Sequence, residues 1–215
     1  MPIMVGKSIT GVIIAGGLSR RMGGGDKALR MLAGRPLLAH VVARLGPQVG
    51  RLVLNANGDP ARFAAFGMPV VADATEDRPG PLAGLLAGMR WAGSEGCPTR
   101  WLASSPADTP FLPVDLVERL CAAAESEGRP IALAASSGGL QQLCGLWSID
   151  LMDDLARALA EGTRRVLEWA ERHRPVRVDF PDTLAGGTAC DPFLNVNRPE
   201  DLALAEALLA QRGGD

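Results

Sequence analysis

The chain has 215 residues, 47% of them hydrophobic, and a formal net charge of −2, so it is long and apolar enough to form one globular domain with a sizeable core. The balanced charge and only 4% aromatic residues argue against a nucleic-acid-binding face. No apolar stretch approaches the roughly 20 residues of a membrane span, and the first residues lack the apolar core of a signal peptide. We therefore expect a cytoplasmic protein that contacts no membrane.

The organisation of the sequence predicts a single domain. We expect residues 1–8 to be a flexible lead-in and residues 9–215 to fold together, because the sequence has neither a linker nor an internal repeat. The four cysteines form no CxxC pair and are expected to be small buried residues. His40 and His173 lie far apart in the sequence, which argues against a histidine triad or a zinc enzyme.

The first predicted element is a strand at residues 11–15, an apolar run that we expect to be buried on both faces. A loop with five glycines follows it directly, contains Arg20 and Arg21, and ends at Lys27. Small residues after a buried strand let backbone N–H groups approach an anion closely. Neither GxxxxGK[ST] nor GxGxxG is present. A tight turn with solvated arginines is the alternative, but strand, glycines and cations together favour a polyphosphate site.

Helical and extended patterns alternate along the rest of the chain. After a segment of undetermined type at 28–32, helices are predicted at 37–45, 60–66, 82–91, 114–127, 149–161, 165–172 and 199–211. Strands are predicted at 51–55, 69–72, 99–103, 131–135, 142–147 and 176–180, with a loop at 182–191 and a short extended piece at 193–197. This alternation predicts an α/β fold: a single Rossmann-like three-layer domain with a mainly parallel, mixed sheet covered by helices on both faces.

Glycine or polar residues stand at the ends of four predicted strands, namely Gly16 with Gly17, Asn55, Asp73 and Asp108. Ligands of such sheets bind beyond the carboxyl ends of the strands. A single residue of this kind is more commonly a helix cap or a turn former. Their common placement favours one shared crevice.

Asp108 lies between two prolines, which would hold its carboxylate in a fixed direction. A carboxylate opposite a phosphate loop is suited to Mg²⁺, which takes few protein ligands and keeps several waters. The alternative is an N-cap or an Asx turn before the helix at 114, and only the phosphate loop favours the metal. In the absence of a candidate nucleophile, we expect phosphoryl or nucleotidyl transfer by positioning. In that reaction Lys27 and Arg21 would offset the charge that develops on the phosphates.

Six features occur in order along the sequence: IAGGLSRRMGGGDK at 14–27, NAN at 55–57, Asp73, PGPLAG at 79–84, DTP at 108–110 and NVNRPED at 195–201. By these motifs the sequence resembles the molybdenum cofactor guanylyltransferases of the nucleotide-diphospho-sugar transferase-like superfamily, from about Ile9 to Leu209. The resemblance implies a Mg²⁺-dependent enzyme that moves GMP from GTP to the terminal phosphate of molybdenum-molybdopterin and releases pyrophosphate. It also implies transient contact with proteins of cofactor insertion or molybdoenzyme maturation.

Site residues carry over from the family position by position. The resemblance assigns GTP contacts to Ile14, Ala15, Gly16, Gly17, Lys27, Asn55, Asp73 and Asp108, with Asp108 also holding Mg²⁺. It assigns the pterin side to Gly80, Pro81, Gly84, Asn195 and Asn197.

The choice of nucleotide also rests on the resemblance. Related cytidylyltransferases usually carry alanine at the position of Gly16 and tend to carry aspartates at those of Asn195 and Asn197, so guanine is favoured. Gln141 and Gln142 replace a His-Pro pair of many members, which leaves any substrate contact there open. The alternatives are a cytidylyltransferase, a sugar-1-phosphate nucleotidyltransferase, or a non-catalytic nucleotide-binding or cofactor-binding protein.

Overall fold

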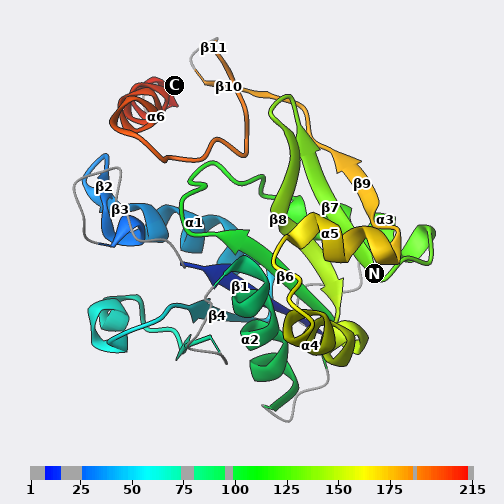
Figure 1. The fold of residues 1–215 in the computed structure, drawn as a ribbon. Coiled ribbons are helices and arrows are strands. Elements are labelled where there is room, and N and C mark those ends of the chain that lie inside the picture. The colour runs from blue at the N-terminus through cyan, green and yellow to red at the C-terminus, as the bar shows by residue number, and fades with distance from the viewer. Residues whose placement is uncertain (1–7, 16–25, 74–79, 95–98, 186–187, 213–215) are drawn as a thin grey trace.

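The computed structural model describes residues 8–15, 26–73, 80–94, 99–185 and 188–212. In this part of the chain a seven-stranded sheet lies between two layers of helices (Figure 1). In spatial order its strands are β5 (Val70–Val71), β4 (Arg51–Asn55), β1 (Ile9–Ile14), β6 (Trp101–Pro106), β8 (Gly139–Ser148), β7 (Ile131–Ser136) and β9 (Val176–Asp179). β8 is antiparallel to β6 and β7, and the other neighbours are parallel. The predicted fold class is therefore confirmed.

The helices are α1 (Leu37–Leu45), α2 (Pro81–Ser94), α3 (Leu116–Ser126), α4 (Met152–Ala160), α5 (Val166–Ala170) and α6 (Pro199–Arg212). Short 3₁₀ turns are η3 (Lys27–Leu29), η4 (Gly46–Gln48), η5 (Pro60–Phe66), η6 (Ile149–Leu151) and η7 (Glu171–His173). Two small hairpins pair β2 (Met31–Leu32) with β3 (Arg35–Pro36), and β10 (Thr183–Ala185) with β11 (Thr188–Cys190). Among the described helices, none combines the length and hydropathy needed to cross a bilayer.

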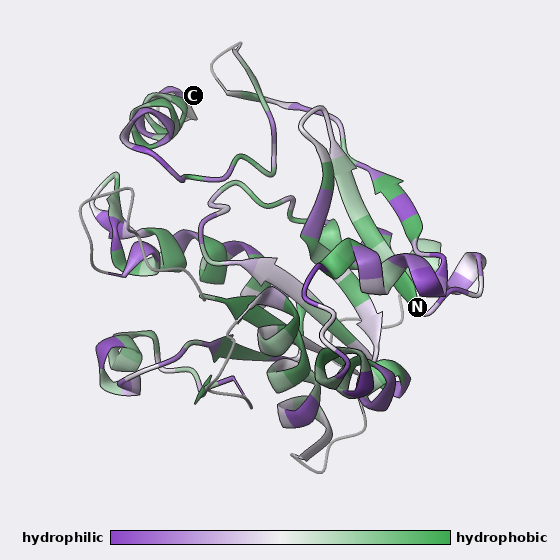
Figure 2. Cartoon of the chain, in the orientation of Figure 1, coloured by the Kyte–Doolittle hydropathy of each residue, from purple (hydrophilic) through white to green (hydrophobic). Residues whose placement is uncertain are grey.

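Strand β1 is buried along its whole length, as its apolar run predicts. Successive side chains of a strand point to opposite faces, so Ile9 and Ile13 pack with α1 and α3, while Val12 and Ile14 pack with α2, α4 and α5. Figure 2 shows β1 and β4 as strongly hydrophobic strands at the centre of the molecule. The central position of β1 therefore fixes where the chain leaves the sheet toward Lys27.

The predicted loop at residues 182–191 is wrong, because these residues contain the β10–β11 hairpin, which pairs Thr183 with Cys190. The short helix predicted at residues 60–66 is confirmed as a 3₁₀ helix with the same bounds. The piece at 193–197, predicted to be extended, belongs to no strand. The hairpin depends on a tertiary contact, because Cys190 is buried in a separate apolar cluster with Phe111 of the chain after β6. Local patterns of hydropathy do not contain that contact.

This separate cluster joins the C-terminal helix to the start of α1. Its buried members are Leu32, Leu37, Phe111, Cys190, Val196, Ala205 and Leu208. Val196 belongs to the segment that precedes α6, so packing of α6 also holds that segment in place. Figure 1 shows α6 (red) and the β10–β11 hairpin on the same side of the sheet as β2 and β3.

Helix α2 lies unusually close to β1 and β4 because two glycines face the sheet. A Cβ atom on Gly84 would lie 2.2 Å from Oδ1 of Asn55, and one on Gly88 would lie 3.0 Å from Cβ of Val12. Real Cβ atoms do not approach an oxygen to 2.2 Å, so any side chain at position 84 has to displace Asn55. Gly93 lies in the same helix, and a Cβ atom there would meet nothing within 4 Å.

We expect Gly84→Ala to lower the free energy of unfolding by roughly 1–3 kcal/mol, the usual cost of overpacking a dense core. Gly93→Ala is the matched control and should raise this free energy by up to about 1 kcal/mol, because alanine favours the helix and restricts the unfolded chain. Urea unfolding of both variants measures the difference. Equal effects of the two substitutions would show that α2 does not contact Asn55 so closely.

Candidate functional site

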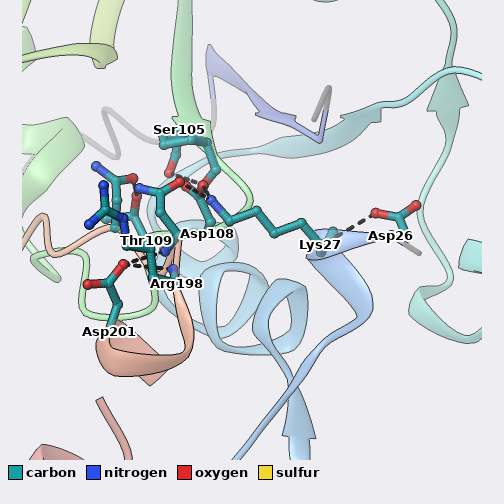
Figure 3. A network of polar contacts seen from close by, with 11 residues as sticks. Asp26, Lys27, Ser105, Asp108, Thr109, Arg198 and Asp201 are labelled. Carbon is teal, nitrogen blue, oxygen red and sulfur yellow. Dashed lines mark hydrogen bonds and ion pairs between the residues drawn. The ribbon is translucent and has the colours of Figure 1, made fainter. Parts of the chain in front are cut away.

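Three polar side chains from distant parts of the sequence meet beyond the carboxyl ends of β1 and β6. The ammonium Nζ of Lys27 donates to Oδ2 of Asp108 and to Oδ1 of Asn197. Figure 3 shows the extended side chain of Lys27 reaching from its own turn to Asp108. Only 15% of the Lys27 side chain and 19% of the Asp108 side chain are exposed, so solvent ions screen this pair weakly. The structure thus brings together the cation and the carboxylate that the sequence placed at this edge.

Lys27 is placed by a capped turn, and Asp108 by a backbone contact with the end of β1. Asp26 accepts a hydrogen bond from the N–H of Ala28 (3.2 Å) and so caps the turn η3, which begins at Lys27. Ala107 N–H donates to the carbonyl of Ile14 (3.1 Å), which extends the pairing of β6 with β1 by one residue beyond the strand. Asp108 follows at once, so its position is tied to the end of the central strand.

Asn195 and Asn197 are held by hydrogen bonds to the turn that contains Asp108 and Thr109, and to the start of α6. Val196 N–H donates to the backbone carbonyl of Asp108 (3.0 Å), and the hydroxyl of Thr109 donates to Oδ1 of Asn195 (3.0 Å). On the other side, Oδ2 of Asp201 accepts from the backbone N–H of Asn197 (2.8 Å) and from that of its successor Arg198, as Figure 3 shows. The segment before α6 is therefore bonded both to the Asp108 turn and to its own helix.

A cavity of about 260 Å³ opens at this meeting point. Its polar lining residues are Lys27, Asp108 and Asn197, and its apolar lining consists of Ile14, Ala15, Ala28, Pro81, Pro106, Ala107 and Leu143. A mostly apolar wall with a few converging polar groups is typical of small-molecule sites.

The two carboxylate oxygens of Asp108 differ in their surroundings. Oδ1 of Asp108 is buried and has no hydrogen-bond partner in the described part of the chain. Burial, and then the negative charge of Asp108, raise the pKa of the Cys144 thiol, which lies on β8. Within the described residues, no group of three or more His, Cys, Asp or Glu side chains gathers into a metal cage. A lone carboxylate with an unsatisfied oxygen fits Mg²⁺, which binds one or two carboxylates together with substrate phosphates.

Asn55 and Asp73 form a second cluster, beside the cavity rather than in its lining. Asp73 accepts from Nδ2 of Asn55 through Oδ1 and from Nδ2 of Asn57 through Oδ2, both at 2.9 Å, and its own N–H donates to Oδ1 of Asn57 (2.9 Å). Ala15, which lines the cavity, donates its N–H to the carbonyl of Asn55 (2.8 Å). The expected single crevice is thus two polar clusters joined through the end of β1.

The other candidate residues divide between these two places. Pro81 lines the cavity, while Gly84 packs closely against the side chain of Asn55. Gly80 precedes α2 and accepts from the N–H of Gly84 (3.1 Å). Asn195 bonds to Thr109 and is not part of the cavity lining. Gly16, Gly17 and Arg21 lie outside the described residues.

Sequence reasoning missed four residues of the cavity wall, namely Ala28, Pro106, Ala107 and Leu143. Leu143 belongs to β8, and only the strand order brings it beside β6. All four are ordinary apolar residues, so no local signal marked them.

The two histidines have structural partners away from the cavity. Nε2 of His40 lies 2.9 Å from the carbonyl of Leu32, and Nε2 of His173 lies 3.0 Å from Oδ2 of Asp154. The hydrogen bond from Trp169, together with that of His173, lowers the pKa of Asp154. This agrees with the argument from sequence against a histidine triad.

The chain matches the MobA-like NTP transferase domain over residues 11–176. It is 49% identical over 209 residues to a protein from a Bradyrhizobium species named molybdenum cofactor guanylyltransferase, with 97% of this chain and 96% of the relative covered. A molybdopterin-guanine dinucleotide biosynthesis protein A from Archaeoglobus fulgidus superposes with a TM-score of 0.71 at 22% identity, covering 94% and 99% of the two chains. A Mycobacterium tuberculosis protein solved as a complex with manganese gives a TM-score of 0.64 at 16% identity, covering 93% and 97%.

The two solved structures are too distant in sequence to show more than a shared fold. The domain match covers most of the chain, and the relative is similar from end to end. Together with the α/β architecture and the order of the motifs, these similarities identify the family. The chain belongs to the molybdenum cofactor guanylyltransferases, a family of nucleotidyltransferases.

Proposed function

We propose that this protein transfers GMP from GTP to the terminal phosphate of molybdenum-molybdopterin, with release of pyrophosphate. The observation that carries the proposal is the meeting of Lys27 and Asp108 beside a cavity at the carboxyl edge of the sheet. A cation and a carboxylate placed together suit a triphosphate with its divalent cation. The acceptor is inferred from the relative, which is named molybdenum cofactor guanylyltransferase.

Lys27 would neutralise charge on the phosphates. An ammonium carries three N–H donors, and the contacts with Asp108 and Asn197 use two of them. The third donor, for which the described residues provide no partner, can bind a phosphate oxygen. In this weakly screened position a fixed cation stabilises developing negative charge more than it would in water.

Asp108 would hold Mg²⁺ through its buried oxygen Oδ1, which has no hydrogen-bond partner among the residues that the structure describes. When bound, Mg²⁺ would neutralise charge on the phosphate oxygens and help to orient them. The other oxygen, Oδ2, keeps the contact with Lys27. A single carboxylate can therefore place both charges that the triphosphate requires.

The nucleotide would extend from the cavity toward the Asn55–Asp73 cluster. Ile14 and Ala15 line the cavity, and the backbone N–H of Ala15 donates a hydrogen bond to the carbonyl of Asn55. For the triphosphate cradle we retain Gly16, Gly17 and Arg21 on the grounds of the sequence alone. Asp73 already accepts two amide hydrogen bonds, which would hold its carboxylate still for a nucleotide.

The pterin substrate would approach from the side of the C-terminal segment. Pro81 and Asn197 line the cavity there, and Asn195 is oriented by Thr109. Gly80 and Gly84 are kept on the pterin side on the grounds of the resemblance alone, because the contact that the structure gives Gly84 is with Asn55 of the nucleotide side. Proteins that insert the cofactor into molybdoenzymes are the proposed transient partners.

The reaction needs no general base from the protein. An oxygen of the acceptor phosphate, already ionised near neutral pH, would form a bond to the α-phosphorus of GTP. The bond from that phosphorus to the bridging oxygen of the β-phosphate would break, and pyrophosphate would leave with its electron pair. Positioning and charge neutralisation by Lys27 and Asp108 would then account for most of the catalysis.

The direct test incubates the purified protein with Mg²⁺, molybdenum-molybdopterin and one nucleoside triphosphate at a time. Of the nucleoside triphosphates, we expect only GTP to give pyrophosphate and a product with the mass of the guanine dinucleotide, detected by mass spectrometry. Product with CTP instead of GTP would favour the cytidylyltransferase alternative. Product only with a sugar 1-phosphate as acceptor, or no product at all, would contradict the proposed reaction.

Asp108→Asn should reduce turnover with saturating GTP at least about 100-fold, because a bound metal supplies several kcal/mol of transition-state stabilisation. It should also raise the Mg²⁺ concentration needed for half-maximal rate. Asp115→Asn is the matched control, since Asp115 is an exposed residue before α3 with no side-chain capping bond. Steady-state rates across a Mg²⁺ titration provide the measurement. Unchanged turnover and metal dependence in Asp108→Asn would remove the proposed metal role.

A further inference from the structure

Arg62, on the 3₁₀ turn η5, links the two polar clusters of the site. Its Nη2 donates to the backbone carbonyl of Asn57, and its Nε lies 3.3 Å from Oδ2 of Asp26. The guanidinium also lies over the ring of Phe63, 4.8 Å from the ring centroid, and Phe63 is buried. Three different contacts therefore fix the orientation of this side chain.

Each polar contact of Arg62 leads to a proposed substrate residue within one further step. Oδ1 of Asp26 caps the turn that begins at Lys27, while Oδ2 of Asp26 contacts Arg62. Asn57 holds Asp73 through both a donated and an accepted hydrogen bond. Arg62 thus stands between the phosphate side and the nucleotide side of the site.

We propose that Arg62 is a positioning residue. Acting through Asp26 and Asn57, it fixes the relative positions of Lys27 and Asp73 that a bound nucleotide requires. This inference rests on the proposed function, because it assumes that a nucleotide spans the two clusters. The role requires a guanidinium. The Nε and Nη2 groups of its planar fork contact two partners at once, whereas a lysine ammonium is a point charge on a flexible stem.

Arg119 provides a closely matched control elsewhere in the molecule. It donates to the carbonyl of Asp179 (2.7 Å), lies 3.8 Å from Oδ2 of Asp115, and stacks 4.0 Å from the ring centroid of Phe180. Its side chain is 36% exposed, against 37% for Arg62. The two arginines therefore make the same three kinds of contact. Arg119 lies on α3, however, and within the described residues its partners Asp115, Asp179 and Phe180 contact no residue of the two polar clusters.

The test compares GTP affinity by calorimetry, and unfolding by urea, in wild type, Arg62→Ala, Arg62→Lys and Arg119→Ala. We expect Arg62→Ala and Arg119→Ala to shift the urea midpoint by similar amounts. Arg62→Ala should weaken GTP binding by roughly tenfold, since small misplacements of reacting or binding groups can cost up to about two orders of magnitude, whereas Arg119→Ala should leave GTP binding unchanged. Arg62→Lys should recover only part of that loss.

A double-mutant cycle with Asp26→Ala tests the route of the effect. If Arg62 acts through Asp26, the double variant should lose less GTP affinity than the sum of the two single losses, because both substitutions remove the same contact. Unchanged GTP affinity in Arg62→Ala, or losses that add fully in the double variant, would overturn the positioning role. Wild-type protein that binds no nucleoside triphosphate would instead contradict the proposed function itself, and the positioning role with it.

Discussion

The contact between Lys27 and Asp108 is the interaction on which the geometry of the site depends. It joins the turn after the glycine loop to the turn after β6, and the two strands β1 and β6 are neighbours. A partly buried charge that lost its partner would be costly, so each residue stabilises the position of the other. Asn197 adds the C-terminal segment to the same ammonium group. Three chain segments thereby close around one cavity.

Much of this arrangement could be predicted because it follows from local patterns and one rule of sheet topology. The apolar run of β1 predicted a strand buried on both faces, and the carboxyl ends of parallel neighbours have to meet at one edge. The place of β8 between β6 and β7 could not be predicted. It depends on long-range contacts such as the hydrogen bond from Trp147 Nε1 to Ser104 Oγ (2.7 Å), which no local periodicity contains.

The supporting residues of the site were harder to predict than its charged residues. Arg62 lies in a short surface turn, where an arginine is typical of a solvated position, and its partner Asp26 is 36 residues away. Thr109 reaches Asn195 across 86 residues. Glycine at 84 was attributed to substrate contact by resemblance, whereas the structure provides a packing reason, the close approach of α2 to Asn55. Such roles arise only when distant segments are assembled.

The proposed function depends on Lys27, which would bind the triphosphate from within this cluster. The most direct measurement is the dissociation constant of GTP for wild type and for Lys27→Ala, taken at one salt concentration with circular dichroism to verify folding. Loss of a weakly screened charge contact predicts GTP binding weaker by a factor of about ten or more in the folded variant. Equal affinity in the two folded proteins would contradict the central role of Lys27.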